Sequence, residues 1–227
     1  MRSRRKIVSL MAIIVFSCLA MSLVDAVIRP DYAVKSAIKI ILFLTLPIGY
    51  AIIAGGVPFR RLFAFERRGL LTSLLLGLGV FAFILGAYFG LGPLFDFTKV
   101  TGALEDNMGV NAGNFVFVAL YISIVNSLLE EFFFRGFAFF TLKEQVGRRF
   151  AYVFSAGAFA VYHVAMMSSW FSIGLFLLLI AGLVVAGLLF NWLNERNGNI
   201  YASWMVHMFA NFAINAIGLM LFGMIGV

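Results

Sequence analysis

Charged residues are scarce in this sequence of 227 residues. Lys, Arg, Asp and Glu make up 12% of it and hydrophobic residues 63%, whereas about a quarter of a typical soluble domain is charged. This balance excludes a soluble globular fold, and the length allows about seven membrane spans of roughly 20 residues each. We therefore expect an all-α, polytopic membrane helix bundle.

Cysteine is nearly absent as well. Cys18 is the only one, which excludes an intramolecular disulfide and a cysteine-based metal cluster. The net charge of +7 does not indicate nucleic-acid binding, because the basic residues fall in short loops between apolar runs, where they set membrane orientation. The lipid bilayer, and not a nucleic acid, is the expected surrounding.

Apolar runs predict where the spans lie: residues 7–24, 38–57, 70–95, 113–142, 150–167, 170–193 and 200–227. A cytoplasmic N-terminus would place twelve Lys and Arg residues inside, Arg67 and Arg68 among them, and four outside, namely Arg29, Lys35, Lys39 and Lys99. Residues 1–112 would then hold three spans without a motif, and residues 113–227 a catalytic core of about four helices. The polar connection 96–112 is expected to be a mobile loop.

Ionisable residues inside spans cost about 2.5–3.5 kcal/mol each and mark functional sites by default. Seven are present here: Asp25 and Lys39 near span ends, Glu130, Glu131 and Arg135 in the fourth run, and His163 and His207, which are the only two histidines of the chain.

The pair Glu130-Glu131 lies inside the membrane, because the apolar run continues for about two to three helical turns beyond it. Neighbouring side chains on a helix diverge by about 100°, so the two acids cannot share one task. Glu131 precedes Arg135 by four residues, which is the spacing of a same-face ion pair. Glu130 is left as the candidate general base, since removal from water makes a carboxylate a stronger base.

Depth indicates one common site. Counted at about 1.5 Å per residue from the expected cytoplasmic ends, Glu130, His163, His207 and Asn211 lie about 12–21 Å deep, nearer the cytoplasmic side. Alone, each histidine is equally explained by a hydrogen bond to a neighbouring helix, and for Asn211 alone a packing role is the default interpretation. Asn126 and Asn215 are interpreted as packing or supporting residues. The agreement in depth across three helices favours a shared cavity.

Three motifs carry a family resemblance: Glu130-Glu131-x-x-x-Arg135, Phe159-x-x-x-His163 and His207-x-x-x-Asn211. Their order and spacing resemble the CAAX prenyl protease and bacteriocin-processing (CPBP, or Abi) family of intramembrane proteases, over about residues 114–216. The resemblance implies that Glu130 and His163 activate water for peptide hydrolysis, that His207 and Asn211 stabilise the oxyanion, and that Glu131 and Arg135 support the site. It implies a protein or peptide substrate at the membrane, either prenylated or carrying a leader or sorting segment, and we expect the bacterial inner membrane as the location.

Three alternatives stay open. The family has also been described as metal-dependent, and zinc could be held by Glu130, His163 and His207; because the sequence has no His-Glu-x-x-His motif, we expect no cofactor. Buried acids and histidines also build transporters or proton-coupled channels, although no inverted repeat is present. A non-catalytic membrane scaffold of the same fold is the third.

Overall fold

The computed structural model describes residues 2–57, 59–64, 69–167 and 171–226. Over these residues its regular structure is helical throughout, and seven helices are long and apolar enough to cross a membrane, which confirms the predicted all-α bundle of seven spans. The predicted loop charges Arg67 and Arg68, and the predicted start of the sixth span at Trp170, lie outside the described residues.

The spans are assembled from shorter segments. The first is α1 (Arg2–Leu23) with the π-turn η1 (Val24–Ile28), and the second is α2 (Tyr32–Ile40), η2 (Ile41–Thr45) and α3 (Leu46–Ala54). After the short α4 (Phe59–Leu62), the third span is α5 (Leu70–Leu91) with η3 (Gly92–Leu94). The fourth consists of α7 (Phe115–Tyr121), η4 (Ile122–Asn126), α8 (Ser127–Glu130), η5 (Glu131–Phe140) and α9 (Thr141–Gln145), and the last three are α10 (Arg148–Met167), α11 (Ile173–Asn197) and α12 (Tyr201–Leu221).

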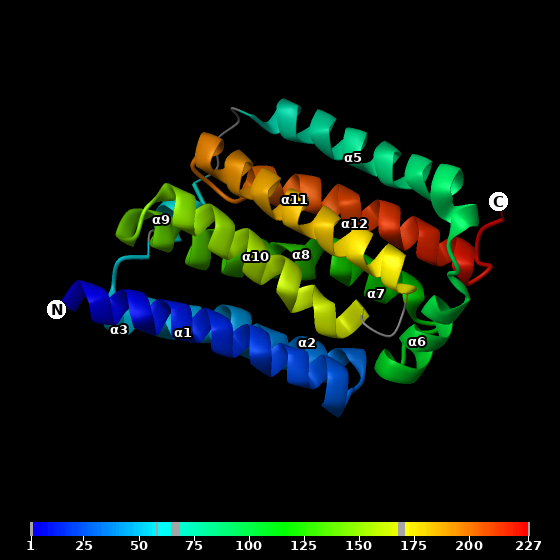
Figure 1. Ribbon diagram of the computed structural model, residues 1–227, viewed down its shortest axis with the longest axis horizontal. Coiled ribbons are helices and arrows are strands. Elements are labelled where there is room, and N and C mark those ends of the chain that lie inside the picture. The colour runs from blue at the N-terminus through cyan, green and yellow to red at the C-terminus, as the bar shows by residue number, and fades with distance from the viewer. Residues whose placement is uncertain (1, 58, 65–68, 168–170, 227) are drawn as a thin grey trace.

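The fourth span forms the centre of the bundle. All ten residues of its π-helical segment η5 are buried, and η5 contacts α1, α10 and α11. Figure 1 shows α1 along one edge of the bundle and α5 along the opposite edge, with the two termini at opposite ends, as an odd number of spans requires. Segment α5 packs mainly on α12, where Gly77 leaves room for the ring of Phe209.

Phenylalanine fills the core around the fourth span. Phe133 stacks on Phe43 of η2 with ring centroids 4.0 Å apart, and Phe134 meets Phe159 of α10 edge to face at 5.4 Å. Such ring pairs contribute about 0.5–1.5 kcal/mol beyond the area they bury. They hold α10 and the second span against the segment that carries the two glutamates.

The second span begins earlier than predicted, because Asp31 caps α2 by accepting a hydrogen bond of 2.9 Å from the Val34 amide. Lys35 and Lys39 consequently lie inside the helix and are buried. The predicted start at residue 38 was therefore too late for Lys35, whereas Lys39 lies in the span, where the sequence placed it near one end. The orientation of the N-terminus stays a prediction, now with only Arg29 and Lys99 of the described basic residues counted on the outer side.

The connection 96–112 is not the mobile loop that its polarity predicts. It contains a helix, α6 (Thr98–Met108), which begins where the Asp96 carboxylate accepts hydrogen bonds of 2.9 Å from the Thr98 amide and 2.6 Å from its hydroxyl. Val100 and Met108 bury one face of α6, and Met108 packs with Phe115 at the start of the fourth span. Overall polarity favoured a loop, but Val100, Leu104 and Met108 recur at every fourth residue, which is the spacing of one helix face.

Candidate active site

Three helices bring the predicted residues together in the interior. Segment α8 ends at Glu130, α10 carries His163 and α12 carries His207; Glu130 and His207 are 2% and 6% exposed. The Oε2 atom of Glu130 lies 3.8 Å from Nε2 of His163 and 3.7 Å from Nε2 of His207. These distances are too long for direct hydrogen bonds, but they leave the three atoms facing one small volume.

The partners of the two imidazole rings fix the position of their hydrogens. His163 Nδ1 lies 2.7 Å from the carbonyl oxygen of Phe159, and His207 Nδ1 lies 2.9 Å from Oε1 of Glu131. Carbonyl and carboxylate oxygens only accept, so Nδ1 is the donor in both rings and Nε2 carries the lone pair when the ring is neutral. A water molecule at this place can donate its two O–H groups to two of the three atoms, the Glu130 oxygen and one imidazole nitrogen, and the nitrogen of the other ring is left for a contact with the substrate.

Glu131 holds His207 in place. Its Oε1 atom also lies 3.2 Å from Nη1 of Arg135, and its Oε2 atom accepts a hydrogen bond of 2.5 Å from the Ser203 hydroxyl. The Arg135 guanidinium lies over the ring of Phe159 at 4.1 Å. The ion pair that the four-residue spacing predicts is therefore present, whereas Ser203, one turn before His207, was not predicted.

Lys39 was expected in a span, near its end, but its contact with the site was not predicted. Its ammonium lies 2.5 Å from Oε1 of Glu130, and 2.6 Å from Oδ1 of Asn126, whose amide in turn donates to the same Glu130 oxygen at 3.1 Å. The available signal was the cost of an unpaired lysine in a span, which requires an acidic partner somewhere in the bundle. The sequence alone did not show that this partner is 91 residues away.

Asn211 and Asn215 fasten α12 to the fourth span. The Asn211 amide donates to the carbonyl of Ile122 at 3.2 Å, and the Asn215 amide donates to the carbonyl of Ala119 at 3.1 Å and to the Ser123 hydroxyl at 3.0 Å. A side-chain amide has two N–H groups, so the contact of Asn211 with Ile122 uses one of them. Its expected role at the oxyanion stays a prediction.

The charges around Glu130 bear on the zinc alternative. Among the described residues, no group of three or more His, Cys, Asp or Glu side chains is identified as a metal site. The Nε2 atoms of His163 and His207 lie 3.8 and 3.7 Å from Glu130 Oε2. The Lys39 ammonium beside the same carboxylate opposes a second cation.

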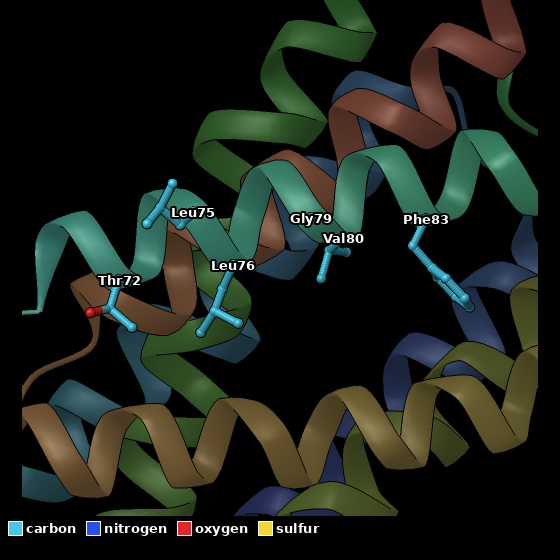
Figure 2. A pocket seen from close by; sticks show the side chains of 6 residues that line it. All are labelled: Thr72, Leu75, Leu76, Gly79, Val80 and Phe83. Atoms are coloured by element: carbon cyan, nitrogen blue, oxygen red, sulfur yellow. The ribbon is translucent and has the colours of Figure 1, made fainter.

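Two cavities lie away from the glutamate pair. One, of about 430 Å³, is an apolar hollow along α5, from which Leu76, Val80 and Phe83 point toward α11 (Figure 2). The other, of about 440 Å³, lies between α2 and α7 and includes Tyr32 and Tyr121. Neither is lined by a predicted site residue, so the chemistry is located by the polar cluster and not by the cavities.

Comparison with known proteins identifies the part of the chain that carries this cluster. Residues 112–213 match the family model of Rce1-like, type II CAAX prenyl endopeptidases. The family predicted from the three motifs is thereby confirmed over these residues, which include every predicted site residue from Glu130 to Asn211. No curated protein and no solved structure matches the chain.

Proposed function

We propose, because residues 112–213 match the CAAX prenyl endopeptidase family, that this integral multi-pass membrane protein is an intramembrane endopeptidase in which Glu130 activates water. The observation that carries the proposal is the position of Glu130 Oε2 between the Nε2 atoms of His163 and His207, on three different helices. A carboxylate and two imidazoles that face one volume are the groups that hold and deprotonate a water molecule.

The proposed reaction starts with water donating its O–H groups to Glu130 Oε2 and to the Nε2 atom of His163. As the water oxygen attacks the peptide carbonyl carbon, Glu130 takes its proton, and the carbonyl π electrons move to the oxygen. Collapse of the tetrahedral intermediate breaks the C–N bond, and Glu130 returns the proton to the leaving amine. Holding both reactants in a buried site supplies the orientation that free water lacks.

Stabilisation of the oxyanion is assigned to His207 and Asn211. His207 can donate from Nε2 only when this atom is protonated, because Nδ1 already donates to Glu131. The Glu131 carboxylate accepts the Nδ1 hydrogen of this ring, and Arg135 and Ser203 hold that carboxylate in place. The second N–H of the Asn211 amide would be the other donor.

The mechanism contains no metal step. It is supported by the ammonium of Lys39, which already compensates the charge of the Glu130 carboxylate and repels a second cation there. Zinc on Glu130, His163 and His207 is the competing arrangement.

The substrate class follows from the family match. We propose a peptide bond in a membrane-associated protein, with a prenylated C-terminus as the first candidate and leader or sorting segments as the others. We place the protein in a bacterial inner membrane with its N-terminus on the cytoplasmic side, so that the site lies nearer the cytoplasmic face.

Comparison of protein termini in membrane fractions tests this function. Cells that produce the wild-type protein should contain a set of cleaved termini that is missing with Glu130→Gln and present with Glu105→Gln, a control at an exposed glutamate of α6. Identical termini in all three strains, with equal amounts of protein in the membrane, would exclude the proposal.

A transporter is the second candidate, because the buried ion pair of Lys39 with Glu130 is also an element from which proton relays are built. Proton or solute flux into liposomes that is lost with Glu130→Gln would favour it.

A further inference from the structure

We propose that Lys39 is a positioning residue of this site, supplied by the part of the chain that precedes the family match, and that it fixes which oxygen of Glu130 meets the water. The inference rests on the proposed function. It adds a residue that none of the three motifs contains and that lies outside residues 112–213.

Lys39 is buried, so its charge interacts with groups inside the bundle. The residue is 4% exposed and lies within the span Tyr32–Ala54, so its ammonium is enclosed by the bundle and does not lie on its outer surface. Its Nζ atom lies 5.3 Å from the ring centre of Phe43 and 4.9 Å from that of Tyr162. These rings confine a flexible side chain that otherwise has many rotamers.

The other buried charges of the first four spans have partners of their own. Lys35, one turn before Lys39, lies 2.5 Å from Asp25, and Arg135 lies 3.2 Å from Glu131. Lys39 therefore pairs with Glu130, and it is not needed to neutralise Glu131 or Asp25.

The contacts of Glu130 divide its two oxygens between two tasks. Oε1 receives Lys39 at 2.5 Å and the Asn126 amide at 3.1 Å, whereas Oε2 faces the two histidines at 3.7 and 3.8 Å. With Oε1 held at two points, the carboxylate cannot rotate to exchange its oxygens, and Oε2 is left to accept the proton of the water. The positive charge of Lys39 also offsets the negative charge of this carboxylate in its apolar surroundings.

A purely structural role is the competing explanation, because any buried ion pair can tie two helices together. The pair of Lys35 with Asp25 provides the matched comparison. It has the same separation of 2.5 Å and also joins α2 to a neighbouring span, but it makes no contact with Glu130. A structural role predicts equal effects for the two pairs, and a positioning role predicts a difference in turnover.

The experiment measures kcat and KM in proteoliposomes with a synthetic peptide that spans the most abundant terminus whose formation requires Glu130. Lys39→Met is compared with the double variant Asp25→Asn/Lys35→Met, which removes the other pair without leaving a buried charge. We expect kcat of Lys39→Met to fall about 100-fold with KM within about twofold, because a misplaced base costs turnover and not binding. Lys39→Arg should recover most of the loss, and the double variant should retain the wild-type kcat.

Two results would overturn the inference: kcat of Lys39→Met within about threefold of wild type, or an equal loss in the double variant at an equal unfolding temperature. If Lys39→Met does not accumulate, Lys39→Leu, which also removes both the N–H donor and the charge, is judged by the same limits. Failure of the proposed function is recognised by a different observation: no protein terminus requires Glu130. In that case both proposals are excluded.

Discussion

Removal of the Arg135 side chain should destabilise the protein more than the loss of an ordinary charge would. Arg135 is completely buried in η5, 3.2 Å from the Glu131 carboxylate and 4.1 Å from the centre of the Phe159 ring. In Arg135→Met the methionine fills much of the volume but leaves Glu131 as a buried charge without its ion-pair partner. Breaking a buried pair in this way costs about 3–5 kcal/mol.

The double variant Glu131→Gln/Arg135→Met removes both charges and should recover most of that loss, since a buried pair often contributes little net stability once neither charge remains. The assay is the free energy of unfolding in mixed micelles, followed by circular dichroism. Arg148→Met is the control. Arg148 pairs with Glu195 at the bundle surface, where its side chain is 61% exposed, and its removal should leave the unfolding transition close to wild type.

Two outcomes would refute this reasoning. One is an unfolding free energy of Arg135→Met within about 1 kcal/mol of wild type, which would mean that the charge is not buried as described. The other is a double variant no more stable than Arg135→Met, which would mean that the unpaired carboxylate is not the source of the loss.

Three further predictions concern the site and the start of α6. Ser203→Ala removes the hydroxyl that donates to Glu131 Oε2, so it should lower the free energy of unfolding by about 1.5–3 kcal/mol, as the loss of a buried hydrogen bond to a charged group does. It should also lower kcat, because Glu131 holds His207; equal kcat and an equal free energy of unfolding would contradict it. Turnover should survive 1,10-phenanthroline and dialysis against chelator, and activity that zinc alone restores would establish the metal alternative. The Thr98 hydroxyl and amide hold the pKa of Asp96 below its usual range, so these two hydrogen bonds should be present at neutral pH and lost only as the pH falls through that lowered value. Asp96→Ala should speed amide hydrogen exchange at the start of α6 at neutral pH, and unchanged exchange would contradict this role of Asp96.

The predictable part of the fold is the part that depends on local sequence. Apolar runs of span length determine the seven helices because each must satisfy its backbone hydrogen bonds within itself in lipid. The ion pair between Glu131 and Arg135 follows from spacing along one helix. Prediction from composition failed in residues 96–112, because the many polar residues indicated a loop although Val100 and Met108 form a buried helix face.

The site was predictable only in its motifs. Glu130, His163 and His207 share a depth and a motif set, and the structure places them around one volume. The partners Lys39 and Ser203 depend on which helices become neighbours, 91 and 72 residues apart in the chain, and neither hydropathy nor helix spacing contains that information. For Lys39 the cost of an unpaired charge required a partner but did not identify it.

Hydrolysis of a quenched fluorescent farnesylated CAAX peptide by purified protein in proteoliposomes tests the central claim most directly. The account predicts cleavage by the wild-type protein and by Glu105→Gln, and a loss of at least about 1,000-fold in kcat with Glu130→Gln, because the amide cannot take a proton from water. Cleavage by Glu130→Gln at the wild-type rate, in a protein with the wild-type unfolding temperature, would contradict the assignment of Glu130 as the base.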